Sequence, residues 1–169
     1  MIGGADEEIS MFRLLIDAID PEMQLINFES RKQPIINRLF IDDFDLLIIH
    51  NPEAFTEAAF DELDIFLQRG GGLIWFSGGM EIDPTYNKYF SNIGFPKAKG
   101  MIESGSGIFS VNIPSKDNHL LSDLNVRKLE NELPECYRYV KHNYSNKHNV
   151  HFQLNNGDPL LLEFNRGSG

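Results

Sequence analysis

The chain has 169 residues, a length that suits one domain. Its 15 Lys and Arg residues against 25 Asp and Glu residues give a net charge of −10, which argues against nucleic-acid binding because phosphate contacts need clustered basic side chains. A hydrophobic content of 41% argues against a disordered chain, and the sole cysteine, Cys136, excludes an internal disulfide and a Cys-based zinc site.

The first predicted element is a helix over residues 6–19. Asp6 is its expected N-cap, because a side-chain oxygen can accept a hydrogen bond from an amide that has no partner within the helix. The dipeptide Asp20-Pro21 is expected to end the helix, and residues 24–28 are expected to form a short strand. Apolar residues at helical spacing predict one stripe along the helix, formed by Ile9, Phe12, Leu15, Ile16 and Ile19.

The next elements predict a βαβ unit. Two unbroken apolar runs, residues 46–49 and 73–76, are typical of strands covered on both faces in a parallel sheet. Between them, Thr56 is an expected N-cap, and the glycines at 70–72 are expected to end the helix. The helix should bury an apolar stripe of Ala59, Phe60, Leu63, Phe66 and Leu67.

The second half of the chain predicts a short helix over residues 84–93, an irregular segment over 94–107 and then mostly antiparallel strands. The segment 155–158, Asn-Asn-Gly-Asp, is a strong hairpin signal between the last two strands. We therefore predict a single α/β domain over residues 1–169, with an open, mostly parallel, three-layer sheet and antiparallel strands added in the C-terminal half. The expected strands cover residues 108–113, 136–142, 149–154 and 159–164.

Ser77 is the first candidate for chemistry, because it directly follows a buried strand, where open α/β sheets place ligand sites. Together with Gly78 and Gly79 it forms only half of a G-x-S-x-G nucleophile elbow, since Trp75 stands where the first glycine should be. A small residue that lets the chain turn away from the sheet is the alternative interpretation.

Histidine partners for Ser77 can be proposed from the same pattern. His50 and Asn51 end the neighbouring strand, and His119 lies in an expected loop near two aspartates. Either histidine could act as a general base, but it could equally be a strand-end or surface residue. The remaining histidines, His142, His148 and His151, show no helical i, i+4 pair that would complete a metal site, so no metal is predicted.

Residues 44–50, the helix that ends at Arg69, and residues 70–79 together resemble the class I glutamine amidotransferase-like superfamily. More narrowly, the chain is similar to the amidotransferase-like domains of membrane-anchored bacterial proteins of the Bat type, which are related to aerotolerance. Residues 118–124 and 157–169 carry the narrower similarity. The resemblance implies a flavodoxin-like or amidotransferase-like fold.

The chain departs from the catalytic members at the position that performs the chemistry. Those members carry a nucleophilic cysteine where Ser77 stands, and a downstream His-x-Glu pair whose nearest match, 151–153, ends in glutamine. We therefore expect a non-enzymatic binding or interaction domain without a cofactor, and its candidate ligand edge comprises His50, Asn51, Ser77, Gly78, Gly79 and His119. A serine-type hydrolase that uses Ser77 with His50 or His119 is the alternative.

The expected setting follows from the resemblance and from the ends of the chain. The segment begins and ends abruptly beside expected strands, so we expect it to be a soluble domain of a longer, membrane-anchored bacterial protein. No apolar run approaches the ~18 residues of a membrane span, so direct insertion of this segment is not expected. The expected partners are other proteins or other domains of the same chain, and not nucleic acid.

Overall fold

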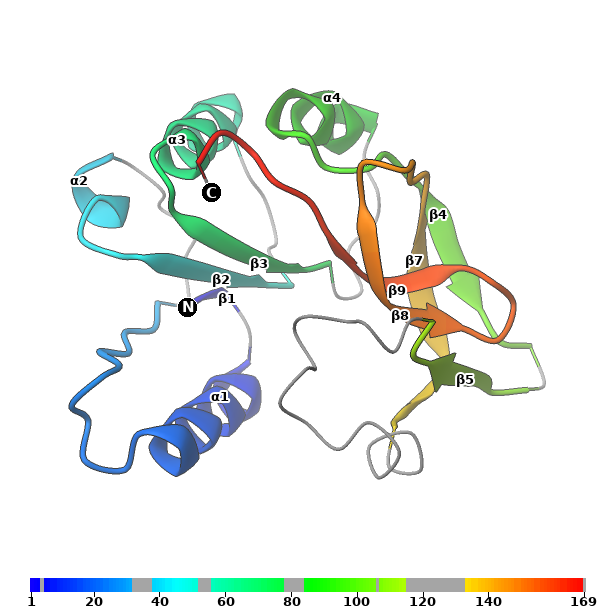
Figure 1. The fold of residues 1–169 in the computed structure, drawn as a ribbon, viewed down its shortest axis with the longest axis horizontal. Helices are drawn as coiled ribbons and strands as arrows, with labels where there is room; N and C mark the ends of the chain where they lie inside the picture. Colours follow the sequence, from blue (N-terminus) through cyan, green and yellow to red (C-terminus); the bar gives the residue numbers. More distant parts are fainter. Residues whose placement is uncertain are drawn as a thin grey trace. The chain divides into compact units, whose positions relative to one another are not determined.

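The computed structural model describes residues 1–3, 5–31, 38–51, 56–77, 84–105, 107–114 and 133–168. Within these residues it is a mixed α/β structure with one parallel sheet and separate antiparallel sheets (Figure 1), as the sequence predicts. The chain divides into two compact units, residues 1–80 with 166–169 (unit 1) and residues 81–165 (unit 2). One domain over residues 1–169 stays a prediction.

Unit 1 is built on a parallel sheet in the order β1 (Ile2–Gly3), β2 (Leu46–His50), β3 (Gly72–Phe76). Helix α1 (Asp6–Ile19) covers one face of this sheet and α3 (Glu57–Gln68) covers the other, while α2 (Arg38–Ile41) precedes β2 (Figure 1). The predicted βαβ unit is confirmed, with β2 and β3 as its strands and α3 as its helix.

The strand predicted over residues 24–28 is wrong. The buried Asp20 carboxylate accepts hydrogen bonds from the amides of Gln24, Leu25 and Ile26 at 2.7–3.1 Å, so these amides are not available to a sheet. The chain instead reaches β1 later, where Arg31 forms a parallel bridge with Ile2.

Helix α1 has the predicted bounds but not the predicted cap. Ala5 is the N-cap, and Asp6 is the first helical residue. Only part of the predicted apolar stripe is shielded from solvent. Its members Ile9, Phe12 and Ile16 are half-buried, whereas Leu15 and Ile19 are 52% and 70% exposed.

Helix α3 has the predicted start, core face and end. The Thr56 hydroxyl accepts a hydrogen bond from the Ala59 amide at 3.2 Å, and all five residues of the predicted apolar stripe are buried. Gly70 follows the helix with a φ of +100°, a conformation that glycine adopts without steric cost. The C-terminal segment then returns to α3, where the Arg166 guanidinium contacts both carboxylate oxygens of Asp64 at 2.7 and 3.1 Å.

The described residues of unit 2 form α4 (Pro84–Ile93) and antiparallel strands. Strand β4 (Ala98–Glu103) pairs with β7 (Arg138–His142). The other sheet has the order β6-β5-β8-β9. Its strands are β5 (Phe109–Asn112), β6 (Glu135–Cys136), β8 (Asn149–Leu154) and β9 (Pro159–Glu163).

Of two predictions for unit 2, one is confirmed and one is wrong. The predicted hairpin is confirmed, with Gly157 at a φ of +87° in the turn between β8 and β9. The prediction that residues 94–107 are irregular is wrong, because β4 forms there. The Asn87 side chain of α4 donates to the Ala98 carbonyl oxygen and accepts from the Ala98 amide, at 2.9 and 2.8 Å, and thus holds the start of this strand.

Among the helices of the described residues, none combines the length and the apolar character needed to cross a membrane.

Candidate functional site

The candidate edge lies at the carboxyl ends of β2 and β3. His50 and Phe76 are register partners, and the Asn51 amide donates to the Phe76 carbonyl oxygen at 2.9 Å. Ser77 is the next residue of the chain after Phe76 and is half-buried. The structure therefore brings His50, Asn51 and Ser77 to one edge of the sheet, as the alternation of strand and helix predicts. The other predicted members, Gly78, Gly79 and His119, lie outside the described residues.

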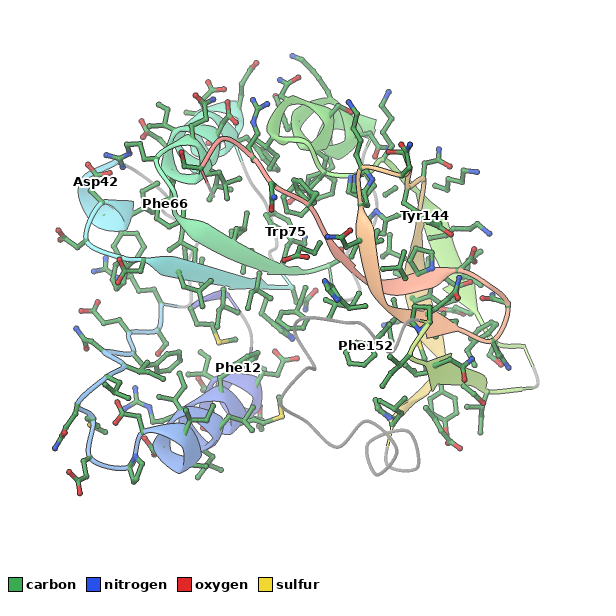
Figure 2. All side chains as sticks on the ribbon, viewed as in Figure 1. Phe12, Asp42, Phe66, Trp75, Tyr144 and Phe152 are labelled. Atoms are coloured by element: carbon green, nitrogen blue, oxygen red, sulfur yellow. The ribbon has the colours of Figure 1, made fainter. Side chains whose placement is uncertain are left out.

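The imidazole of His50 is held between α1 and the sheet. Its Nδ1 lies 3.2 Å from Glu8 Oε2, a contact that becomes an ion pair when the ring is protonated. The ring centroid is 6.2 Å from that of Phe12 and 5.4 Å from that of Phe76. Figure 2 shows Phe12 extending from α1 toward the sheet. Only 17% of the His50 side chain is exposed, so most of it is shielded from solvent.

Glu8 is a member of the site that was not predicted from the sequence. Its carboxylate also accepts the Ala5 amide hydrogen at 2.7 Å, which satisfies one of the free amides at the start of α1. An acid in the first turn of a helix is a common pattern, but the N-cap is Ala5 and not the Ser or Thr of a capping box, so the sequence carries no specific signal for Glu8. Its approach to His50 depends on how α1 packs on β2 and has no local signal.

Glycine at position 3 allows β1 and β2 to meet at this edge. Gly3 has a φ of +79°, and an ideal Cβ on it would lie 2.4 Å from the His50 carbonyl oxygen. Such a distance is far inside van der Waals contact, so any other residue forces the strands to shift. Asn51 is also left-handed, with a φ of +45°, a conformation that asparagine tolerates better than most residues.

Ser77 and His50 do not form a catalytic pair in the described residues. No hydrogen bond joins them there, and the imidazole instead approaches Glu8. His50 and Phe76 face α1, while Trp75 faces α3 and stacks on Phe60 at 6.1 Å.

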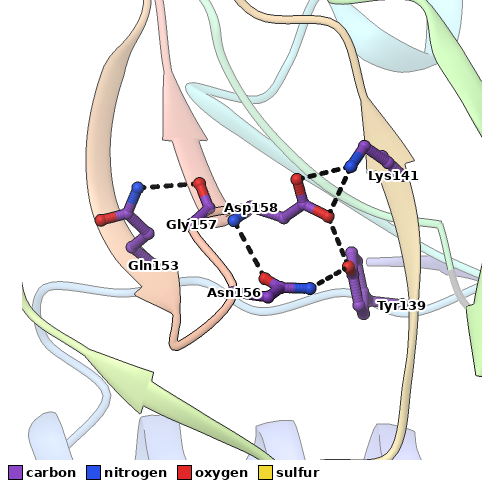
Figure 3. A network of polar contacts seen from close by, with 6 residues as sticks. All are labelled: Tyr139, Lys141, Gln153, Asn156, Gly157 and Asp158. Atoms are coloured by element: carbon purple, nitrogen blue, oxygen red, sulfur yellow. Dashed lines mark hydrogen bonds and ion pairs between the residues drawn. The ribbon is translucent and has the colours of Figure 1, made fainter. Parts of the chain in front are cut away.

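A second polar cluster lies in unit 2, around the β8–β9 hairpin (Figure 3). Asp158 accepts hydrogen bonds from the Tyr139 hydroxyl at 2.5 Å and from Lys141 Nζ at 2.9 Å. Asn156 Nδ2 donates to the same Tyr139 oxygen at 2.8 Å. These contacts fasten the turn to β7.

The electrostatics of this cluster favour a structural role. Burial by itself would raise the pKa of Asp158, but the hydrogen bonds from Lys141 and Tyr139 and the charges of Lys141 and Lys99 outweigh it, so that the pKa lies below its usual value. Burial and the hydrogen bond to Asp158 raise the pKa of Tyr139. A tyrosine with a raised pKa is a poorer general base or nucleophile at neutral pH.

The three remaining described histidines are on or beside strands of unit 2. Within the part of the chain that the structure describes, they form no metal-binding group with other His, Cys, Asp or Glu side chains. His151 is buried, and its Nε2 lies 3.0 Å from Glu163 Oε2 on the neighbouring strand. Burial lowers the pKa of His142, against the opposing effect of its contact with the Pro96 carbonyl oxygen.

Comparisons with known proteins show a fold and not a family. No family model matches the chain, and no curated protein matches it. Its structure is similar to that of the cytoplasmic protein STM3548 from Salmonella typhimurium, with a TM-score of 0.65 and 15% sequence identity. The similarity covers 86% of this chain and 68% of that one. At this identity it supports the mixed α/β fold alone.

Proposed function

We propose that this chain is a non-catalytic, amidotransferase-like binding or interaction domain of a longer, membrane-anchored bacterial protein. The three-layer, mostly parallel, flavodoxin-like architecture is part of the proposal. It is supported by the parallel order β1-β2-β3, by the helices on both faces of that sheet, and by the bridge from Arg31 to the free side of β1.

The single observation that carries the non-catalytic role is the direction of the His50 imidazole. A histidine that activates a serine must lie within hydrogen-bonding distance of its hydroxyl, with an acid orienting the other ring nitrogen. The Glu8 carboxylate lies 3.2 Å from His50 Nδ1, but no hydrogen bond joins His50 to Ser77 in the described residues, and the imidazole instead packs against Phe12 of α1 and against Phe76. With serine in place of the superfamily's cysteine, glutamine hydrolysis is also not expected.

The edge retains groups suited to binding. Glu8, His50, Asn51 and Ser77 bring a carboxylate, an imidazole, an amide and a hydroxyl to the carboxyl end of a parallel sheet, where open α/β proteins bind ligands. The aromatic rings of Phe12 and Phe76 form one apolar side of this edge. A small polar ligand or a protein segment with hydrogen-bonding groups fits this chemistry.

An active-site probe distinguishes the proposal from the hydrolase alternative. The chain is incubated with a fluorophosphonate, which labels activated serines, and the product is examined by mass spectrometry beside a Ser77→Ala variant. We expect no labelling of Ser77 and no release of ammonia from glutamine. Stoichiometric labelling that Ser77→Ala abolishes would refute the non-catalytic role.

The binding role and the setting are tested separately. In an NMR screen of small polar compounds, the amide resonances of His50, Asn51 and Ser77 should move before those of the hairpin turn in unit 2, and His50→Ala should weaken the response. A screen in which only unit 2 responds contradicts the binding edge. Mass spectrometry of the native gene product should find a membrane-associated chain longer than 169 residues, and a mature chain of this length contradicts the proposed setting.

A further inference from the structure

Helix α1 carries a row of large apolar side chains that unit 1 leaves exposed. Met11, Leu15 and Ile19 recur every four residues, with exposed fractions of 51%, 52% and 70%, and Leu14 beside them is 69% exposed. Residues spaced in this way form a ridge along one side of a helix. We call these four residues the α1 outer face.

The α1 outer face is distinct from the surface that attaches the helix to its sheet. Ile9, Phe12 and Ile16 are half-buried, and Phe12 makes edge contacts with His50 and Phe76. A surface helix normally needs one apolar stripe, and this one has a second stripe beside the first. A contiguous patch of exposed apolar residues often marks an interaction surface, whereas single exposed apolar residues are common on any protein.

The turn that follows α1 exposes two more large apolar side chains. Met23 and Leu25 are 68% and 86% exposed. The turn that presents them is fixed by the buried Asp20, whose carboxylate accepts the amides of residues 24–26 and whose carbonyl oxygen accepts the Met23 amide at 3.0 Å. A surface held in place before binding loses little conformational entropy when a partner docks.

The charges around the α1 outer face are mainly acidic. Glu7 precedes Met11 by one turn, Asp17 follows Leu14 by three residues, and Glu22 follows Ile19 by three residues. The basic side chain of this helix, Arg13, has its guanidinium 5.6 Å from the centre of the Phe28 ring, and so points toward the following segment. An occupant of the face therefore meets apolar side chains bordered by carboxylates.

We propose that the α1 outer face is the docking surface for an amphipathic helix of a partner protein, one whose apolar row is flanked by Lys or Arg. The i, i+4 ridge fits the groove of such a helix, and the flanking cations complement Glu7, Asp17 and Glu22. A second copy of the chain would bring the same acidic border and a net charge of −10, which opposes its approach. The α1 outer face shares no residue with the candidate edge, so the inference goes beyond the proposed binding edge.

The first test uses a designed helical peptide with leucines along one side and lysines beside them, and a counterpart with glutamates in place of the lysines. Binding is measured by fluorescence anisotropy at low salt. The lysine peptide should bind at least about tenfold more tightly than the glutamate peptide, and added salt should weaken it. Equal binding of the two peptides, or no binding of the lysine peptide, would overturn the proposal.

Variants of the chain test whether the lysine peptide binds to the α1 outer face. The double variant Leu15→Ser/Ile19→Ser should lower the affinity for the lysine peptide at least about tenfold. The control Ile65→Ser, which replaces a side chain 41% exposed on α3, should leave it unchanged. Far-ultraviolet circular dichroism and Trp75 fluorescence verify that the variants are folded. Binding that survives the double variant, or is lost equally in the control, contradicts the proposed surface.

Two further measurements test whether a second copy of the chain, or another segment of the same chain, covers the α1 outer face instead. Sedimentation should show a monomer, whereas a dimer that dissociates on Leu15→Ser/Ile19→Ser would replace the proposal with a second copy. Peroxide should oxidise Met11 and Met23 in the isolated chain faster than the half-buried Met101, and the lysine peptide should protect them. Protection without the peptide would mean that the chain itself covers the face, and would overturn the proposal.

Discussion

Replacing Gly3 by alanine tests whether the close approach of β1 to β2 forms the candidate edge. Gly3 has a φ of +79°, and its added Cβ would lie 2.4 Å from the His50 carbonyl oxygen. A left-handed conformation costs an L-residue roughly 1–2 kcal/mol, and overpacking adds about 1–3 kcal/mol. We therefore expect Gly3→Ala to lower the free energy of unfolding of unit 1 by about 2–5 kcal/mol.

Gly70→Ala is the matched control, because it separates the conformational cost from the steric one. Gly70 has a φ of +100°, but its Cβ would meet its nearest neighbour, the Ser168 carbonyl oxygen, at 3.6 Å, an ordinary contact. This variant should lose only the conformational part, roughly 1–2 kcal/mol. The difference between the two variants measures the clash with His50.

The assay is urea unfolding followed by tryptophan fluorescence. Trp75 is the one tryptophan of the chain and lies in β3, so its emission reports on unit 1 alone. With a denaturant slope of about 2 kcal/mol per M, the expected loss lowers the midpoint for Gly3→Ala by about 1–2.5 M. A midpoint for Gly3→Ala equal to that of Gly70→Ala would refute the inferred approach of the two strands.

Three further predictions follow from the same structure. Leu63→Ala in the core of α3 should cost about 2–5 kcal/mol in urea unfolding, whereas Ile65→Ala on its exposed side should stay within about 0.5 kcal/mol of the parent chain. Thr56→Ala should cost about 1 kcal/mol, Thr56→Ser should retain most of the cap, and equal losses would contradict the role of the hydroxyl. Because the pKa of Asp158 is lowered in the folded state, its stabilising effect is present above the ordinary value of 3.8 and is lost as the pH falls below it. Near-ultraviolet circular dichroism of the five tyrosines, all in unit 2, should therefore show a weaker loss of stability with acid in Asp158→Asn, and an unchanged acid profile would contradict the network.

The elements that were predicted correctly depend on local patterns. The period of the apolar residues in α3, the hydroxyl of Thr56 and the glycine of the β8–β9 turn act within a few residues of themselves. Each favours its conformation before distant contacts form. These features were therefore accessible without knowledge of the packing.

The two wrong predictions of secondary structure arise where the local composition favours one conformation but hydrogen bonds favour another. These hydrogen bonds come from a nearby side chain in one case and from a distant strand in the other. Residues 24–28 have the composition of a strand, but Asp20 binds the amides of three residues in that stretch, Gln24, Leu25 and Ile26. Residues 98–103 include a glycine and polar side chains typical of a loop, but β7, about forty residues later, supplies hydrogen-bonding partners for a strand. Side-chain hydrogen bonds and long-range pairing thus overrode propensity in opposite directions.

The sequence by itself determined the mixed α/β class, the βαβ unit and the placing of His50, Asn51 and Ser77 at one sheet edge, because the succession of strands and helices along the chain and the ends of the strands follow from local patterns. Only the tertiary structure decided that Glu8 meets His50, that Gly3 must remain small beneath it, and that two of the five residues of the predicted α1 stripe are exposed. The physical reason is that these features depend on how α1 is rotated and packed against β2. That rotation is set by contacts between side chains some forty residues apart, which no local period encodes.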